Sequence, residues 1–350
     1  ILCMRDQRDF RFIILAFIGV MFLYVGKSAW EFFVHGRHVY RMGIPRMIGI
    51  DITYGDPNSF SATICYSLPL VWAMIRSKFE NNHLRRFLWV YGCLAIVAII
   101  MTGSRSGMVT ALLFFLIIFL STSRKFLAIF VISTALLFLW QVMPEDLQTR
   151  FLSTFVHDVG PENAQQSADG RMRGFRHGMS LFAENPILGV GPNNYPLSWD
   201  SRMNAHNLYG QLFGELGLLG GGGFGILLIL MFVKNRGIIR RFKLMTPSES
   251  KESYPSNHDV RALNGGLQRT FHLSGLQDRK PEKTFIMDLG PVPLVFYSFV
   301  AQAIIHTIIL MLFKGWGDHN LYRYTWLWLA ALTVLGHHFF QQEVKRIGQS

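Results

Sequence analysis

Long apolar segments recur along the whole chain and constrain its fold more than any other feature. At 50% hydrophobic and 16% charged residues, the 350-residue chain has too little polar surface for a water-soluble fold. In lipid each segment must satisfy its own backbone hydrogen bonds, so the sequence predicts an all-α polytopic membrane protein. About eight transmembrane helices are expected, at roughly 12–34, 59–75, 87–102, 107–122, 126–143, 207–233, 291–313 and 324–340.

The basic residues predict how these helices are oriented. Arginines and lysines before the first segment, and in the connections near 76–86, 124–125, 234–243 and 345–346, fall on one side. The positive-inside rule predicts that this side is cytoplasmic and that the loop 144–206 lies on the outer face. Arginines on that outer face oppose the rule, so they are either anion ligands or solvated side chains. They are Arg37, Arg41, Arg46, Arg105, Arg150, Arg171, Arg173, Arg176 and Arg202.

The chain is predicted to be a single integral-membrane domain over 1–350. A polar segment without apolar periodicity, 244–290, is interpreted as a flexible cytoplasmic insert. The first residue is Ile1 and not Met, which leaves open that N-terminal spans are missing. The widely spaced Cys3, Cys65 and Cys93 indicate neither a disulfide framework nor a metal site. We expect no nucleic-acid partner and no ATP chemistry, since neither a zinc-ligand spacing nor a P-loop is visible.

The outer loop 144–206 is expected to contain a helix that Asp169 caps and that ends at Asn185–Pro186. An apolar stripe at helical spacing would lie on the membrane surface or against the bundle. It comprises Met172, Phe175, Met179 and Phe182. Arg171, Arg173 and Arg176 would project near the polar boundary, where the alternative to anion binding is snorkelling.

Two further positions on the outer face could carry chemistry. The short turn Thr102–Gly107 holds Arg105 between two helices, which favours a preorganised anion ligand over a plain turn. His206 stands at the mouth of the sixth span and could act as a general base, because histidine titrates near pH 6.5, or could simply cap the helix. Glu215 and the surrounding glycines in that span are interpreted as close helix packing. These glycines are Gly217, Gly220, Gly221, Gly222, Gly223 and Gly225.

Five short motifs follow one another between residues 102 and 220. They are Thr102-Gly-Ser-Arg-Ser-Gly107, Asp169-Gly-Arg171 followed by Phe175 and Phe182, Asn185-Pro-Ile-Leu-Gly-Val-Gly-Pro-Asn-Asn-Tyr195, Ala205-His-Asn-Leu-Tyr209 and Glu215-Leu-Gly-Leu-Leu-Gly220. In order and spacing they resemble the O-antigen ligase and polymerase superfamily of bacterial inner-membrane proteins, over about residues 40–230. Members usually have more N-terminal spans, and they commonly carry Trp where Phe175 stands.

The resemblance implies a metal-independent glycosyltransferase that needs no cofactor. It would move a glycan from undecaprenyl diphosphate to a sugar hydroxyl of lipid A-core on the periplasmic face. Alternatives are a polymerase, a protein O-oligosaccharyltransferase or, outside the enzymes, a transporter of the lipid-linked glycan. Arg171 and Arg105 are expected to bind the diphosphate, and His206 to orient or deprotonate the acceptor, a role that Asp51, Asp56 or Asp169 could take instead. Further substrate-binding candidates are Arg37, Arg41, Arg46, Arg173, Arg176, Tyr195 and Asn207.

Overall fold

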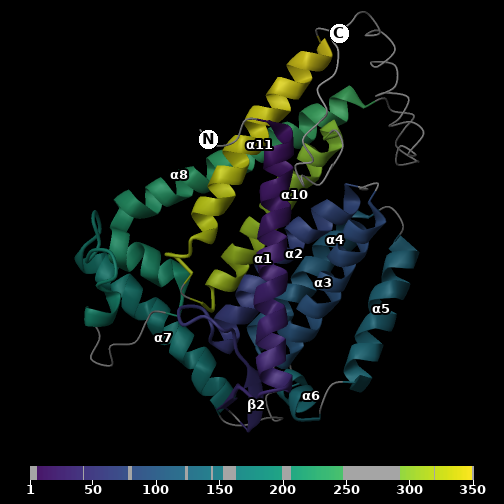
Figure 1. Cartoon of the computed structure of the whole chain (residues 1–350). Coiled ribbons are helices and arrows are strands. Elements are labelled where there is room, and N and C mark those ends of the chain that lie inside the picture. The colour runs from purple at the N-terminus through teal and green to yellow at the C-terminus, as the bar shows by residue number, and fades with distance from the viewer. Residues whose placement is uncertain are drawn as a thin grey trace, which may run out of the picture.

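The computed structural model describes residues 6–41, 43–77, 81–122, 125–142, 145–152, 163–198, 206–246, 292–318 and 320–348. Most of this part of the chain is helical (Figure 1). The helices are α1 (Gln7–Phe33), α2 (Pro57–Arg76), α3 (Asn82–Met101), α4 (Arg105–Ser121), α5 (Lys125–Val142), α6 (Glu145–Leu152), α7 (Asn163–Glu184), α8 (Leu208–Met245), α10 (Leu294–Gly315) and α11 (Thr325–Gly348). A short 3-10 helix, η1, covers Tyr195–Ser198, and two strands, β1 (His38–Arg41) and β2 (Ile44–Met47), pair antiparallel.

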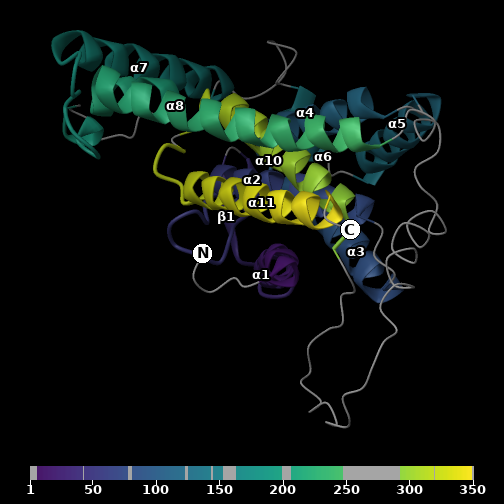
Figure 2. The same ribbon diagram turned by 90° about the horizontal axis from the view of Figure 1, so that it is seen from above.

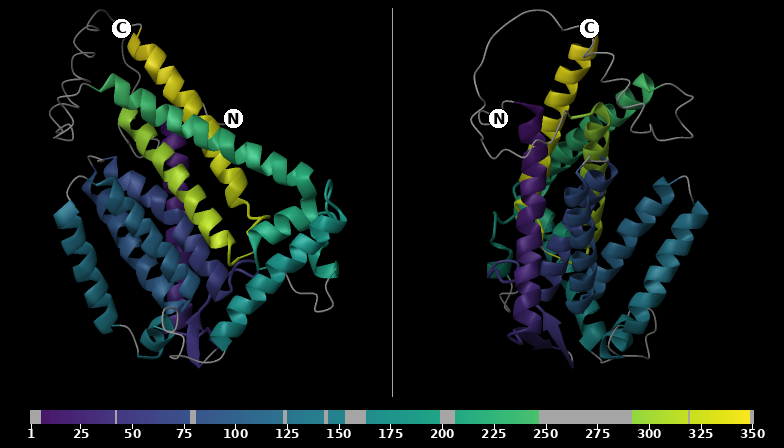
Figure 3. Two further views of the ribbon diagram at one scale, coloured as in Figure 1. Left: turned by 180° about the vertical axis from the view of Figure 1, so that it is seen from behind. Right: turned by 45° about the vertical axis from the view of Figure 1, so that its right-hand side comes forward.

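Two helices form the centre of the bundle. α10 packs against α2, α8 and α11, while α2 also contacts α1, α3 and α4. α7 and α8 lie side by side, and α1 is seen end-on when the bundle is viewed from above (Figure 2). α5 contacts α4 at the edge of the bundle and stands apart from the central helices (Figure 3). The bundle therefore has a buried centre around α2 and α10 with more exposed helices around it.

Outward-facing apolar side chains indicate which environment surrounds the bundle. One face of α1 buries Phe10, Ile14 and Ile18, whereas Phe12 and Leu23 on another face are exposed. Such side chains are unfavourable in water but are well solvated by lipid. Among the described residues, α1, α3, α8 and α10 are long and apolar enough to cross a membrane, and α4 is a shorter apolar helix. The chain is thus a multi-pass membrane protein, while the count of eight spans and their orientation stay predictions.

Each of the eight predicted apolar segments contains a helix, but the structure adds one hairpin and differs from two local predictions. The loop after α1 holds the β1–β2 hairpin, with His38 paired to Met47. Helix α7 begins at Asn163, so Asp169 lies inside the helix and does not cap it. Alanine and glutamine before Asp169 favour helix and explain the earlier start. α8 continues to Met245, well past the expected end. Most of the predicted insert 244–290, from residue 247 on, lies outside the described residues.

Helix α8 is interrupted near its start. Gly217 has φ of 60° and ψ of −159°, a conformation that residues with a β-carbon avoid. The preceding loop hydrogen-bonds to the backbone on both sides of this break. Amides of Val190 and Gly191 donate to Gly214 and Glu215 carbonyls at 2.9 Å, and amides of Leu218 and Leu219 donate to Pro186 and Ile187 carbonyls at 2.8 and 3.1 Å. The loop therefore satisfies backbone groups that the break would otherwise leave unpaired.

Glycines in and beside α8 allow two kinds of close approach. A β-carbon at Gly217 would lie 2.4 Å from the carbonyl oxygen of Ile187, so this glycine fits the loop. Between helices the tight contact is at Gly178 of α7, where a β-carbon would lie 2.2 Å from the Gly210 carbonyl oxygen. The prediction of close packing is wrong further along α8. The atoms nearest to a β-carbon at Gly220 and Gly221 belong to side chains of α8 itself, and nothing in the described part of the chain lies within 4 Å of the β-carbon position at Gly222, Gly223 or Gly225.

Candidate functional site

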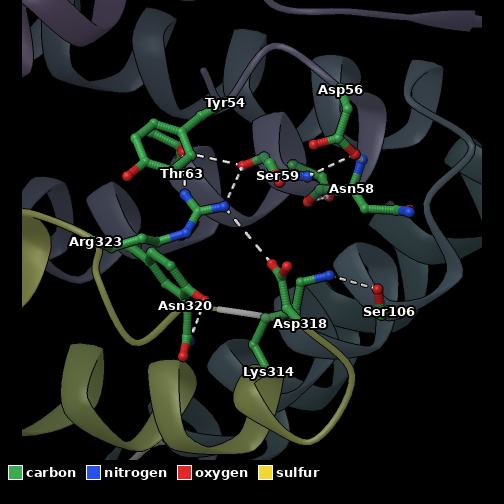
Figure 4. Close-up of polar contacts among 12 residues, drawn as sticks. Tyr54, Asp56, Asn58, Ser59, Thr63, Ser106, Lys314, Asp318, Asn320 and Arg323 are labelled. Carbon is green, nitrogen blue, oxygen red and sulfur yellow. Dashed lines mark hydrogen bonds and ion pairs between the residues drawn. The ribbon is translucent and has the colours of Figure 1, made fainter. Parts of the chain in front are cut away.

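Polar side chains from four separate connections meet where α2 and α4 begin and α10 ends. These four connections are the ones predicted for the outer face. We call five of their residues the charged cluster: Arg105, Arg171, Lys314, Asp318 and Arg323. Figure 4 shows three of them pointing toward one another: Lys314 from the end of α10, and Asp318 and Arg323 from the connection that follows it. Among these described side chains four are basic and one is acidic, so positive charge is in excess.

Arg323 is held in a fixed orientation although it lies in the connection between α10 and α11. Its side chain is buried, and Nη1 donates a hydrogen bond to Oγ1 of Thr63 at 2.9 Å. Nη2 lies 3.6 Å from Oδ2 of Asp318, and the guanidinium carbon lies 4.4 Å from the ring centroid of Tyr54. A buried ion pair that is also hydrogen-bonded and stacked loses little further freedom when a ligand binds.

Lys314 and Asn320 anchor the end of α10 and the connection after it to the interior of the bundle. Nζ of the buried Lys314 donates a hydrogen bond to the hydroxyl of Ser106, at the start of α4. Asn320, with no exposed surface, donates to the carbonyl of Met311 at 2.9 Å and to the hydroxyl of Tyr66 at 3.3 Å. The connection is therefore built into the bundle and is not a loose surface loop.

Arg171 brings the outer helix α7 to this cluster. Burial lowers the pKa of its guanidinium group, the charge of Arg105 lowers it further, and the carboxylate of Asp318 raises it. Arginine nevertheless stays protonated in proteins, so two like charges face each other here. No described residue accepts a hydrogen bond from the guanidinium group of Arg171. An anion placed between these arginines would relieve both the desolvation and the repulsion.

His206 directly precedes Asn207, which contacts the segment after α10. Asn207 caps α8, accepting hydrogen bonds from the amides of Tyr209 and Gly210, and its Nδ2 donates to the carbonyl of Trp316 at 3.0 Å. Trp316 also packs against Phe175 of α7, with ring centroids 5.5 Å apart. His206 is exposed and has φ of 46°, a conformation that is uncommon for residues other than glycine and that recurs at functional sites.

Other predicted site residues lie elsewhere or are already engaged. Arg37, Arg41, Arg173 and Arg176 are exposed, the first two around β1 and the others on faces of α7 away from Arg171. Arg46 is buried, and its guanidinium group donates to the Thr102 carbonyl at 2.7 Å and to Oδ1 of Asn58 at 3.0 Å. The side chain of Asn207 is used inside the fold as described above. Tyr195 is buried and donates to the Gly174 carbonyl.

The three alternative aspartates differ in their surroundings. Asp56 caps α2 through the amides of Asn58 and Ser59, and Asp51 accepts hydrogen bonds from the hydroxyl of Tyr24 and the amide of Tyr54. Asp169 is exposed on α7. Of the three, Asp169 alone makes no hydrogen bond or ion pair with the described residues, and whether any of them acts as a base stays a prediction.

Sequence reasoning missed Lys314, Asp318 and Arg323. A signal was present, because Lys314 and Arg323 are basic residues in a short connection on the predicted outer face, as Arg105 is. In isolation they resemble ordinary residues of a membrane interface. Only the packing of α10 between α2 and α8 brings them to Ser106, Thr63 and Arg171.

A family model matches a continuous stretch of the chain that contains part of this site. Residues 90–225 match a family model described as O-antigen ligase. The match runs from α3 to just beyond the break in α8, and it includes Arg105, Arg171 and His206 but not the segment 314–323. No curated protein matches the sequence.

Proposed function

Residues 90–225 of this chain belong to the O-antigen ligase family, and from that premise we propose that the protein transfers a glycan from undecaprenyl diphosphate to a sugar hydroxyl of lipid A-core. Members of this family are glycosyltransferase-like enzymes whose substrates are a lipid-linked glycan and an acceptor. The transfer is proposed to occur on the periplasmic face of the inner membrane.

The excess of positive charge in the charged cluster is the observation that carries this proposal. In the reaction the bond between the anomeric carbon and the phosphate oxygen breaks, and the carrier diphosphate leaves with an additional negative charge. A new bond joins the anomeric carbon to the acceptor oxygen. Fixed cations placed where the negative charge grows lower the barrier most, because they need no reorganisation during the reaction.

Arg171 and Arg105 are proposed to hold the diphosphate. Each guanidinium group can donate two parallel hydrogen bonds to phosphate oxygens, and a bound diphosphate would replace mutual repulsion with attraction. Lys314 and Arg323 add positive charge from the end of α10 and the connection that follows it, and Asp318 forms an ion pair with Arg323. These cations can supply the electrostatic stabilisation that a metal ion gives in other phosphate-dependent enzymes, so we propose metal-independent transfer.

The acceptor hydroxyl must lose a proton as its oxygen attacks the anomeric carbon. His206 is proposed to accept this proton or to orient the hydroxyl, because it is exposed and directly precedes Asn207, which bonds to Trp316, and Trp316 packs against Phe175 of α7. The proton then leaves to solvent, and the diphosphate keeps the electron pair of the broken bond.

Purified protein in lipid nanodiscs tests the function directly. We expect glycan transfer from a polyprenyl-diphosphate glycan to lipid A-core, and loss of transfer in Arg105→Ala but not in Arg85→Ala, an exposed arginine on α3. Chain extension on a second donor molecule would identify a polymerase, and transfer to a peptide would identify an oligosaccharyltransferase. Movement of the lipid-linked glycan across the bilayer without bond formation would make the protein a transporter and overturn the proposal.

A further inference from the structure

Glu215 is a carboxylate buried inside an apolar helix, two residues before the break at Gly217. It has no exposed surface. Its oxygens accept hydrogen bonds from the amide of Tyr195 at 3.1 Å, from the hydroxyl of Tyr322, and from Nε2 of Gln211 at 3.4 Å. A buried carboxylate is costly unless donors surround it, so this arrangement is specific for an acidic side chain.

Two of the donors to Glu215 link it to parts of the chain that carry the charged cluster. Tyr322 directly precedes Arg323, and its hydroxyl oxygen also accepts from the amide of Asn193 at 3.3 Å. Burial and the hydrogen bond to Glu215 raise the pKa of Tyr322, so its hydroxyl stays a donor at every physiological pH. On the other side, the hydroxyl of Tyr195 donates to the carbonyl of Gly174 at 2.6 Å, one turn after Arg171 on α7.

Hydrogen bonds through Tyr322, Glu215 and Tyr195 therefore link the connection that carries Arg323 to the helix that carries Arg171. We propose that Glu215 is a positioning residue that, through Tyr322 and Tyr195, sets the distance between the two arginine-bearing segments and so fixes the charged cluster for a diphosphate. This inference rests on the proposed function and deepens it. Glu215 itself does not touch the substrate in this arrangement.

The chemistry explains why glutamine should not replace glutamate here. All three groups facing the carboxylate are donors, and both of its oxygens accept. The amide nitrogen of glutamine would itself be a donor and would face one of them. Glu215→Gln therefore keeps the size and shape of the side chain but loses one of the hydrogen bonds that Glu215 accepts.

Binding of farnesyl diphosphate to the full-length protein in nanodiscs tests the inference without requiring turnover. Tyr322→Phe removes only the hydroxyl group, and we expect it to weaken binding about tenfold, which is about 1.4 kcal/mol. Glu215→Gln should weaken binding by at least as much. Tyr324→Phe is the matched control, because Tyr324 lies on the same segment and is exposed. It should bind as the wild type does.

A double-mutant cycle separates positioning from general destabilisation. If Tyr322 acts by placing the arginines, Tyr322→Phe should weaken binding less than about twofold when Arg171→Lys is already present. Equal effects in both backgrounds, or wild-type binding by Tyr322→Phe, would overturn the positioning role while leaving the proposed function intact. Failure of the wild-type protein to bind farnesyl diphosphate would reject the diphosphate site itself, and the positioning role with it.

Discussion

Arg171 of α7 lies directly over Gly317, just beyond the end of α10. A β-carbon at Gly317 would lie 3.2 Å from Nε and 3.4 Å from the guanidinium carbon of Arg171. The glycine thus gives the guanidinium group room next to the segment that carries Asp318 and Arg323. This contact joins a part of the chain that matches the family model to one that does not.

Replacement of Arg171 should therefore affect catalysis directly. Arg171→Ala is expected to lower turnover at least about a hundredfold, on the order of 3 kcal/mol for a preorganised contact to developing charge. Arg171→Lys keeps the charge but loses the planar fork, and should recover only part of the activity. Steady-state rates of glycan transfer measure both. Full activity of the lysine variant would reduce Arg171 to a general surface charge.

The helices could be predicted from the sequence because a long apolar segment in lipid can satisfy its backbone hydrogen bonds in few ways other than by forming a helix. The hairpin at β1 and β2 could not, since its residues show neither clear alternation nor a strong turn dipeptide. The break in α8 also escaped prediction. Gly217 is one of several glycines in that span, and only the loop at Asn185–Gly191 shows which of them leaves the helical conformation.

The site was predictable in part. Arg105 and Arg171 stood out because they oppose the topology rule, and the structure places them close together. Tyr195 and Asn207 were chosen from motifs, yet their polar atoms bond to Gly174 and Trp316 inside the fold. A motif alone does not separate residues that bind a substrate from residues that hold its binding site together.

His206 should affect the acceptor step and not the binding of the carrier. His206→Ala is expected to lower transfer while the affinity for farnesyl diphosphate stays near that of the wild type. In the wild type, transfer should fall as the pH drops through about 6.5, where histidine takes up a proton and can no longer accept one. Isothermal titration and a pH profile of the rate give the two readouts. Unchanged transfer by His206→Ala would assign the base to Asp169 or another aspartate.

Chelation should leave the enzyme active. In the proposed mechanism, Arg105, Arg171 and the neighbouring basic side chains supply the positive charge at the diphosphate. We expect transfer in EDTA at the rate measured without it. Loss of activity that Mg²⁺ or Mn²⁺ restores would show that the arginines act together with a metal ion.

Gly217 should be among the least replaceable positions of α8. Gly217→Ala introduces a β-carbon where φ is 60° and where the Ile187 carbonyl oxygen would be 2.4 Å away. A loss of about 1–3 kcal/mol in the free energy of unfolding is expected, measured as a lower thermal transition in detergent. Gly222→Ala is the control, because nothing lies within 4 Å of its β-carbon position. Similar transitions for both variants would contradict the strained break.

Cysteine labelling in intact cells tests the predicted orientation. A cysteine at Ser198, an exposed position on η1, should react with a membrane-impermeant thiol reagent. A cysteine at Ser256, in the predicted cytoplasmic insert, should resist it until the cells are opened. The reverse pattern would place the charged cluster on the cytoplasmic side and exclude a periplasmic transferase.

The hydrogen bond from Arg323 to Thr63 joins positions 260 residues apart. Translation delivers Thr63, Arg105 and Arg171 early, and Lys314, Asp318 and Arg323 only with the final two helices. A growing chain that has already produced α2, α4 and α7 therefore still lacks three of the five residues of its charged cluster. Under the proposed function, a growing chain that has not yet reached Arg323 would lack part of the positive charge that holds the diphosphate, so half-made molecules would not consume the lipid-linked donor.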